Sequence, residues 1–460
     1  MYVLWDIEGN VADYFKPAED LACMLFYRNK LKLTLAIIAL CLATVRSIGW
    51  AAKNKPAKPG DSPAKLKAYP SRYYVIYTDL GDEVAAEASA RMTAMAEEYH
   101  RRTRGFAGVI RHRLPFYLYA RAEDYRAAGG LPGSAGQYDS GRRVLMALAG
   151  RRPSLSLWHT VQHEGFHQFV HLAIGGRVPI WINEGLAEYF GAGIWTGDSF
   201  VTGLIASRRL EAVKQHIKKN QIMPFSNFLA ITGDQWRGAF DQRQKDGHKS
   251  ESSSKTGRDK SDGDTPKVNR VRINYDQAWS MVHFLIHAEG GRYRKSFAGL
   301  ISDISAGTNW KRSFQKRFGT NIEAFQKRYC GWWLALPSDA TRDLTIKAHL
   351  ATLTSFLARA TSQGQSFADV AQFLGEARAG RLKCHPAQKL PASLLERSLV
   401  DIRGWNRGWR FDDTGSGPIR LVLAWPDGTT FTGSFTIGGG RCGNVKVTVA
   451  RPGQAKQTRP

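Results

Sequence analysis

The sequence predicts an α+β fold in which a small mixed sheet precedes a run of helices, with a smaller helical and β-rich module at the end of the chain. Three observations lead to this prediction. Short apolar segments rich in aromatic and β-branched residues, typical of strands, occur before residue 150. Longer segments with the helical spacing of apolar residues follow. Further strand-like runs lie beyond residue 420, separated by Pro-Asp-Gly and Gly-Gly-Gly turns.

The chain is long enough and apolar enough for two or three globular domains. It has 460 residues, of which 43% are apolar and 23% are charged. Its net charge of +25 predicts attraction to an anionic partner such as a cell-surface polymer. Because Lys and Arg are scattered from end to end, without a basic stripe interleaved with aromatic residues, the sequence argues against specific nucleic-acid binding.

The N-terminal region, residues 1–52, has the pattern of a secretory signal peptide. Arg28, Lys30 and Lys32 precede the uncharged, largely apolar run Leu33–Val45, and Gly49-Trp50-Ala51 resembles an A-x-A cleavage site. The pattern predicts export to the periplasm or the medium. An uncleaved anchor in the membrane is the alternative, although this apolar run is shorter than the about 20 residues that a helix needs to cross a bilayer.

The first folded domain is predicted to span residues 69–337, after a flexible linker at residues 53–68 that is rich in Lys, Pro and Ala. Strands and helices alternate in its early part. We expect strands at 72–78, 114–120 and 142–149, and helices at 83–104 and 124–128.

The rest of this domain is predicted to be helical, apart from one insertion. The expected helices cover 155–173, 180–190, 204–219, 225–229, 275–289, 293–304, 310–318 and 322–333. Residues 241–270 contain no Leu, Ile or Phe and many Lys, Ser, Asp and Gly, so they cannot bury a core. We therefore expect a disordered surface insertion there.

The last module, residues 338–460, is predicted to be helical at first and then rich in strands. The expected helices cover 344–361 and 367–379, and the expected strands cover 421–425, 429–437 and 444–449. Cys330, Cys384 and Cys442 are the cysteines that remain after signal cleavage. One disulfide is compatible with this number in an exported protein, with Cys384–Cys442 as a candidate pair, and the sequence leaves the pairing open.

The predicted helix at 155–173 contains an HExxH motif, His163-Glu164-Gly165-Phe166-His167. Residues four apart on a helix are separated by about 400°, so both imidazoles lie on one face, one turn apart. This spacing suits two ligands of one zinc ion, and the Glu beside the first His can act as a general base toward water at the metal. His159 and His171 continue the same column and also have ligand spacing, but only the pair that begins at His163 carries this acid.

A third ligand is available from the next predicted helix. Sixteen residues lie between His167 and Glu184, enough for a turn and the return of a second helix that presents a carboxylate. Two histidines and one carboxylate leave a fourth zinc position open, as a catalytic zinc site requires. Glu188 lies one turn after Glu184 and can accept the other ring N–H of a ligand histidine, which fixes its orientation. A solvated helix carboxylate is the alternative for Glu188.

The segments HEGFHQ and PIWINEGLAEYF resemble the gluzincin superfamily of zinc metallopeptidases, most closely the peptidase MA-like families. The resemblance covers about residues 72–333, with its specific motifs confined to 163–190. It implies a thermolysin-like catalytic fold, with a mixed sheet, an active-site helix and a helical lower lobe, in which 142–149 is the edge strand that aligns substrate. It also implies the site residues: His163, His167 and Glu184 as zinc ligands, Glu164 as base and Glu188 as the acid behind a ligand histidine.

Enzymes of this kind need a hydrogen-bond donor for the oxyanion, and Tyr275 is the candidate. It opens a predicted helix after the insertion, and related aminopeptidases have a tyrosine at a comparable distance beyond the third ligand once the insertion is discounted. An ordinary packed tyrosine is the alternative. The GxMEN-type motif with which the large aminopeptidase family binds the substrate α-amine is missing near 141–150, which argues against that exopeptidase activity.

The sequence therefore predicts a secreted zinc metallopeptidase that hydrolyses peptide or protein substrates with metal-activated water and Glu164 as general base. The alternative is a non-catalytic, zinc-containing secreted protein that docks to an anionic cell-surface polymer through its basic charge. The intact Glu164 argues against this alternative, because a purely structural zinc site does not need a base.

Overall fold

The computed structural model describes residues 65–175, 178–236, 270–405, 408–414 and 417–453. The predicted signal peptide lies outside the described residues. So do most of the predicted linker and all of the predicted insertion except Arg270. The described chain is a mixed α+β structure, as the sequence predicted at this level. It divides into two compact units: the described residues within 65–89, 99–192 and 205–340 form the first, and those within 90–98, 193–204 and 341–453 form the second.

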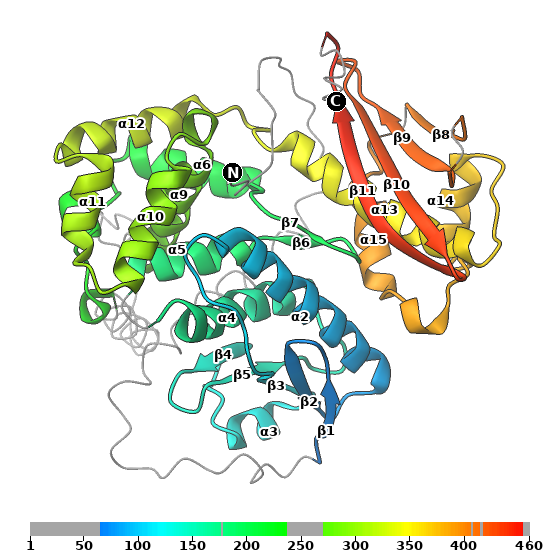
Figure 1. Cartoon of the computed structure of the whole chain (residues 1–460), viewed down its shortest axis with the longest axis horizontal. Helices are drawn as coiled ribbons and strands as arrows, with labels where there is room; N and C mark the ends of the chain where they lie inside the picture. Colours follow the sequence, from blue (N-terminus) through cyan, green and yellow to red (C-terminus); the bar gives the residue numbers. More distant parts are fainter. Residues whose placement is uncertain (1–64, 176–177, 237–269, 406–407, 415–416, 454–460) are drawn as a thin grey trace, which may run out of the picture. The chain divides into compact units, whose positions relative to one another are not determined.

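The first unit contains a five-stranded mixed sheet in the order β1-β2-β3-β5-β4 (Figure 1). Its strands are β1 (Lys67–Pro70), β2 (Tyr74–Thr78), β3 (Leu114–Tyr119), β4 (Gly136–Asp139) and β5 (Val144–Leu148). The three central strands, β2, β3 and β5, run parallel to one another, and the two outer strands pair antiparallel to their neighbours. The first strand begins inside the segment that composition had assigned to the linker.

Residues 142–149 do contain a strand, but the prediction that this strand lies at the edge of the sheet is wrong. β5 occupies this segment, but it lies between β3 and β4, so that β4 forms the edge. The chain turns back between Asp139 and Val144 through Arg143, which adopts a left-handed conformation with φ of 59°. β4 has the short, mostly polar sequence Gly-Gln-Tyr-Asp, which carries little strand signal by itself and becomes a strand by pairing with β5.

The sheet has a helix packed on each face. α4 (Leu155–Ala173) packs on β4 and β5, and α3 (Ala122–Ala127) lies on the other side (Figure 1). Successive side chains of a strand point to opposite faces of the sheet, so each strand can contact both helix layers. In β5, Val144 and Met146 pack with Tyr125 of α3, while the intervening Leu145 is buried on the opposite face. At its N-terminus α4 is capped by Ser154, whose hydroxyl accepts the Leu157 N–H at 3.1 Å.

α5 (Ile180–Gly191) follows α4 and packs against it and against α9 (Arg270–Gly291). Its sequence is apolar on nearly every side, and ten of its twelve residues are buried, as expected for a helix enclosed by neighbours. Gly185 permits a close approach, since a Cβ at this position would lie 2.4 Å from the carbonyl oxygen of Ala278 in α9. α5 is therefore fixed between α9 and α4, the helix that carries the HExxH segment.

The remaining helices of the first unit complete the helical part. They are α6 (Ser207–Lys218), α7 (Phe225–Phe228), α10 (Arg294–Ser305), α11 (Trp310–Phe318) and α12 (Ile322–Ala335). α2 (Asp82–Thr103) is shared, because residues 90–98 belong to the second unit. Within the described residues, no helix combines the length and the apolar character that a membrane crossing requires.

The second unit is built on a four-stranded antiparallel sheet in the order β11-β10-β9-β8. Its elements are β8 (Trp409–Asp412), β9 (Arg420–Ala424), β10 (Thr430–Gly438), β11 (Arg441–Ala450), α13 (Arg342–Ser362), α14 (Val370–Arg378), α15 (Ala392–Asp401) and the short pair β6 (Ile194–Trp195) and β7 (Phe200–Val201). α13 packs on β10 and β11, and its Arg359 makes a bidentate ion pair with Asp198 at 2.9 and 3.0 Å.

The cysteines in the described part of the chain are not cross-linked. Cys330, Cys384 and Cys442 are all free thiols, so the candidate Cys384–Cys442 disulfide is not formed. Cys442 lies in β11, where its backbone N–H and C=O both bond to the side-chain amide of Gln388 at 3.1 and 2.9 Å. These bonds anchor the end of the sheet without a covalent link.

Candidate metal centre

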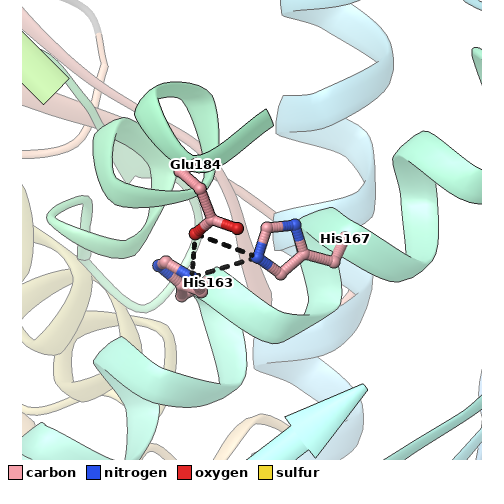
Figure 2. Close-up of side chains that lie close together, drawn as sticks. All are labelled: His163, His167 and Glu184. Carbon is pink, nitrogen blue, oxygen red and sulfur yellow. Dashed lines mark hydrogen bonds and ion pairs between the residues drawn. The ribbon is translucent and has the colours of Figure 1, made fainter. Parts of the chain in front are cut away.

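α4 and α5 bring three potential ligands together in the interior of the first unit. His163 and His167 project from one face of α4, and Glu184 projects toward them from α5 (Figure 2). All three are buried, with exposed fractions of 2%, 6% and 1% respectively. Among the described residues, these three form the group whose His and carboxylate atoms could hold a metal ion.

The three ligand atoms form a nearly equilateral triangle. Nε2 of His163 lies 3.1 Å from Nε2 of His167, and Oε2 of Glu184 lies 3.5 Å from the first nitrogen and 3.6 Å from the second. Bonds of about 2.0–2.2 Å to a tetrahedral zinc ion place neighbouring ligand atoms about 3.3 Å apart. The triangle therefore has the size of one face of a zinc coordination tetrahedron.

Polar contacts behind the histidines determine which ring nitrogens face the centre. Nδ1 of His167 lies 3.1 Å from Oδ1 of Asn183, and Nδ1 of His163 lies 3.2 Å from Oε1 of Glu188. Both partner atoms are acceptors, so each Nδ1 carries its proton and each neutral ring presents the lone pair of Nε2 to the centre. Two nitrogen acceptors and a carboxylate oxygen thus converge without a donor between them, which is an arrangement that a cation satisfies.

The pKa of Glu184 responds to positive charge at this point. Burial alone would raise the pKa of Glu184, but the imidazoles of His167 and His163, when they carry the extra proton, outweigh it and lower this pKa to about 2. Its Oε2 is buried and has no hydrogen-bond partner among the described residues. A buried, ionised oxygen without a donor is costly unless a cation binds it, so the cluster has the charge and the geometry of a metal site.

Glu164 lies beside the three ligands on α4 and is completely buried. Its Oε2 accepts the backbone N–H of Tyr138 in β4 at 3.0 Å, while its Oε1 has no hydrogen-bond partner among the described residues. Burial raises the pKa of Glu164 above its ordinary value, and the two imidazoles and the Tyr138 N–H only partly offset this effect. A carboxylate held at one oxygen and with a raised pKa is suited to accept and return a proton.

Tyr275 also reaches the cluster, from the first part of α9. Its ring centroid lies 6.5 Å from that of His163, and its ring also packs in a T-shaped arrangement with Trp236. The structure therefore brings together all six predicted site residues. The other two histidines of the column lie outside the group of ligands: His159 is half-buried beside Gly191, and His171 packs edge-on against Tyr138.

Two contributors to the site were missed from the sequence. Asn183 precedes the predicted ligand Glu184, and its proximity in sequence was a usable signal that it lies near the centre. The Tyr138 N–H gave no such signal, because a backbone donor has no sequence pattern and β4 itself was not predicted.

No protein-family model, curated protein or solved structure matches this chain. The geometry of the cluster and the chemistry of its residues therefore carry the functional argument.

Proposed function

We propose that the chain is a zinc-dependent peptidase of gluzincin type, with a thermolysin-like catalytic fold in its first unit. The observation that supports this proposal most strongly is the convergence of three acceptor atoms, two imidazole nitrogens and one carboxylate oxygen, on a buried point beside Glu164. A structural metal site needs the acceptors alone, whereas hydrolysis also needs a base.

The donor set favours zinc. Two neutral imidazoles and one carboxylate, with a triangle of 3.1–3.6 Å, suit a tetrahedral ion with one position left for water or substrate. Zinc held by His163, His167 and Glu184 would supply Lewis-acid chemistry, by lowering the pKa of water and polarising a peptide carbonyl.

Glu164 would move the proton in this reaction. Its Oε1 is the oxygen that can accept a proton from the attacking water, because Oε2 is already held by the Tyr138 N–H. The same carboxyl then gives the proton to the leaving amine. The raised pKa of Glu164 favours the first step, because the carboxylate is then a stronger base toward water.

The sheet edge suits an extended peptide. β4 has a partner strand on one side only, and its Tyr138 N–H points away from that partner to Glu164. The base therefore lies along the edge at which an added peptide strand would pair. Tyr275, whose ring lies near that of His163, is the candidate donor to the oxyanion.

Glu164→Gln tests the proposal. We expect the purified wild type to contain about one zinc ion per chain and to cleave members of a mixed peptide library. The variant should keep its zinc and lose on the order of 10²–10⁴-fold in kcat, the usual contribution of a general base. Glu289→Gln is a matched control, because this carboxylate contacts Arg292 and Tyr293 instead of the cluster.

The outcomes separate the two functions predicted from the sequence. Cleavage by the wild type and by Glu289→Gln, but not by Glu164→Gln, supports the peptidase. A wild type without zinc contradicts the proposal. Zinc content without cleavage of any peptide favours the non-catalytic zinc protein.

A further inference from the structure

Arg209 of α6 lies behind the metal cluster, in contact with both α5 and α9. Its Nη1 is 2.7 Å from Oε2 of Glu188, and its Nε is 3.0 Å from Oδ1 of Asp276. Its guanidinium also lies over the ring of Trp279, 4.2 Å from the centroid. The side chain is 19% exposed, so solvent screens these contacts only weakly.

With this contact, each carboxylate oxygen of Glu188 has a partner of its own. Oε1 faces Nδ1 of His163 at 3.2 Å and Oε2 faces Arg209. Without the arginine, the buried carboxylate would lose its charge partner and the contact that stops it from rotating away from His163.

Asp276 of α9 is the second carboxylate that holds Arg209, and it has basic neighbours of its own. Oδ2 of Asp276 lies 3.4 Å from Nε2 of His216 and 3.7 Å from Nε of Arg272, while Oδ1 accepts from Arg209. Asp276 is 6% exposed and directly follows Tyr275 in α9. A chain of contacts thus runs from this segment of α9 through Arg209 and Glu188 to His163.

We propose that Arg209 is a positioning residue of the metal centre, which holds Glu188 against Nδ1 of His163 and links this ligand to the segment of α9 that carries Tyr275. The inference rests on the metal site of the proposed function, and it does not depend on the identity of a substrate. It also explains why a largely enclosed arginine, which is costly to desolvate, lies next to a cluster that is to receive a cation: its charge is balanced by Glu188 and Asp276.

The direct test is the zinc affinity of Arg209→Gln, measured on the full chain by competition with a chromophoric chelator. Residues that orient a ligand histidine typically contribute about 10- to 100-fold to metal affinity, and we expect a loss in this range. The absorption spectrum of the Co²⁺-substituted variant should also change, since a rotated His163 alters the ligand field. Arg317→Gln is the matched control, because Arg317 makes a comparable two-point ion pair with Asp303 at 2.8 and 2.9 Å.

A double-mutant cycle separates positioning from general packing. If Arg209 acts through Glu188, then Arg209→Gln should cost little zinc affinity in a chain that already carries Glu188→Gln. Equal losses in both backgrounds would overturn the role through Glu188. Should Arg209→Gln fail to fold, Arg209→Lys keeps the charge but not the two-point geometry, and we expect it to fold with an intermediate loss of zinc affinity.

The remaining outcomes are also decisive. A folded Arg209→Gln, or a folded Arg209→Lys where the first variant is unstable, with the zinc affinity and Co²⁺ spectrum of the wild type overturns the inference and leaves the proposed function intact. A loss of affinity in Arg317→Gln equal to that in Arg209→Gln overturns it as well, because the effect would then follow any lost ion pair. A wild type that binds no zinc overturns the proposed function, and this inference with it.

Discussion

Gly185 is the position where a single methyl group should disturb the metal centre without removing a ligand. It follows Glu184 in α5 and faces α9. A Cβ at this position would lie 2.4 Å from the carbonyl oxygen of Ala278 and 2.7 Å from Cγ2 of Val282. The first of these atoms belongs to the backbone of a helix, so it cannot move away by a change of rotamer.

The expected magnitude follows from these distances. Ordinary contacts begin near 3.4 Å, so Gly185→Ala must separate α5 and α9 locally by about 1 Å. Overpacking of this kind typically costs about 1–3 kcal/mol, and the better helix propensity of Ala returns about 1 kcal/mol. We expect a net loss of up to about 2 kcal/mol in the free energy of unfolding. Because Glu184 moves with α5, zinc affinity should fall by about 10-fold or more, as it does when a residue that orients a metal ligand is lost.

Urea unfolding of the metal-free protein and chelator competition measure these two effects separately. Gly331→Ala is the matched control: it lies in α12, is exposed, and has nothing within 4 Å of its would-be Cβ. This control should gain about 0.5–1 kcal/mol from helix propensity and keep its zinc affinity. A Gly185→Ala variant that is as stable as Gly331→Ala and binds zinc like the wild type would refute the reasoning.

Three further predictions concern single side chains. Glu184→Gln removes the anionic ligand, and chelator competition should show a loss of zinc affinity larger than the about 10- to 100-fold typical of residues behind the ligands; an unchanged affinity would place the metal elsewhere. Tyr275→Phe should keep zinc but lower kcat by about 10²–10³-fold in steady-state assays, whereas an unchanged kcat would mean that the tyrosine only packs against His163. Hydrogen bonds from Arg317 and Ser313 lower the pKa of Asp303 from 3.8 to about 2, so its stabilisation is complete above the unfolded pKa and is lost as the pH falls through the folded one. In Asp303→Asn the urea midpoint should therefore fall less steeply between about pH 4 and pH 2 than in the wild type. An equally steep fall in the variant would mean that ionised Asp303 does not stabilise the fold.

Helices with strong local signals were predicted closely from the sequence. The predicted helix at 155–173 is α4 with the same bounds, because Ser154 caps one end and glycine follows the other. The predicted helix at 310–318 is α11, which begins after the capping residue Asn309. In both cases the information that sets the ends lies in adjacent residues, so no tertiary contact is needed to locate them.

Short strands and polar helices were missed because their stability comes from distant partners. β4 has one apolar residue in four and exists through its pairing with β5. α15 was not predicted, although its Leu394, Leu395 and Leu399 pack into the core of the second unit. A preceding proline and a short amphipathic run do not distinguish such a helix from a loop until the surface it packs against is known.

The metal centre shows the same difference between signals in nearby residues and contacts with distant ones. This difference explains which of its residues could be predicted. His163 and His167 follow from the spacing of one helix, and Glu184 from a turn of plausible length together with the family resemblance. What makes these atoms a metal site is the direction of the ring nitrogens, and that depends on acceptors behind them, Asn183 and Glu188. The acceptor Glu188 in turn depends on Arg209 in another helix, with no regular spacing from it. Spacing therefore predicts which ligands can converge, whereas the tautomers and charges that make them bind a cation come from the packing of α5, α6 and α9 around them.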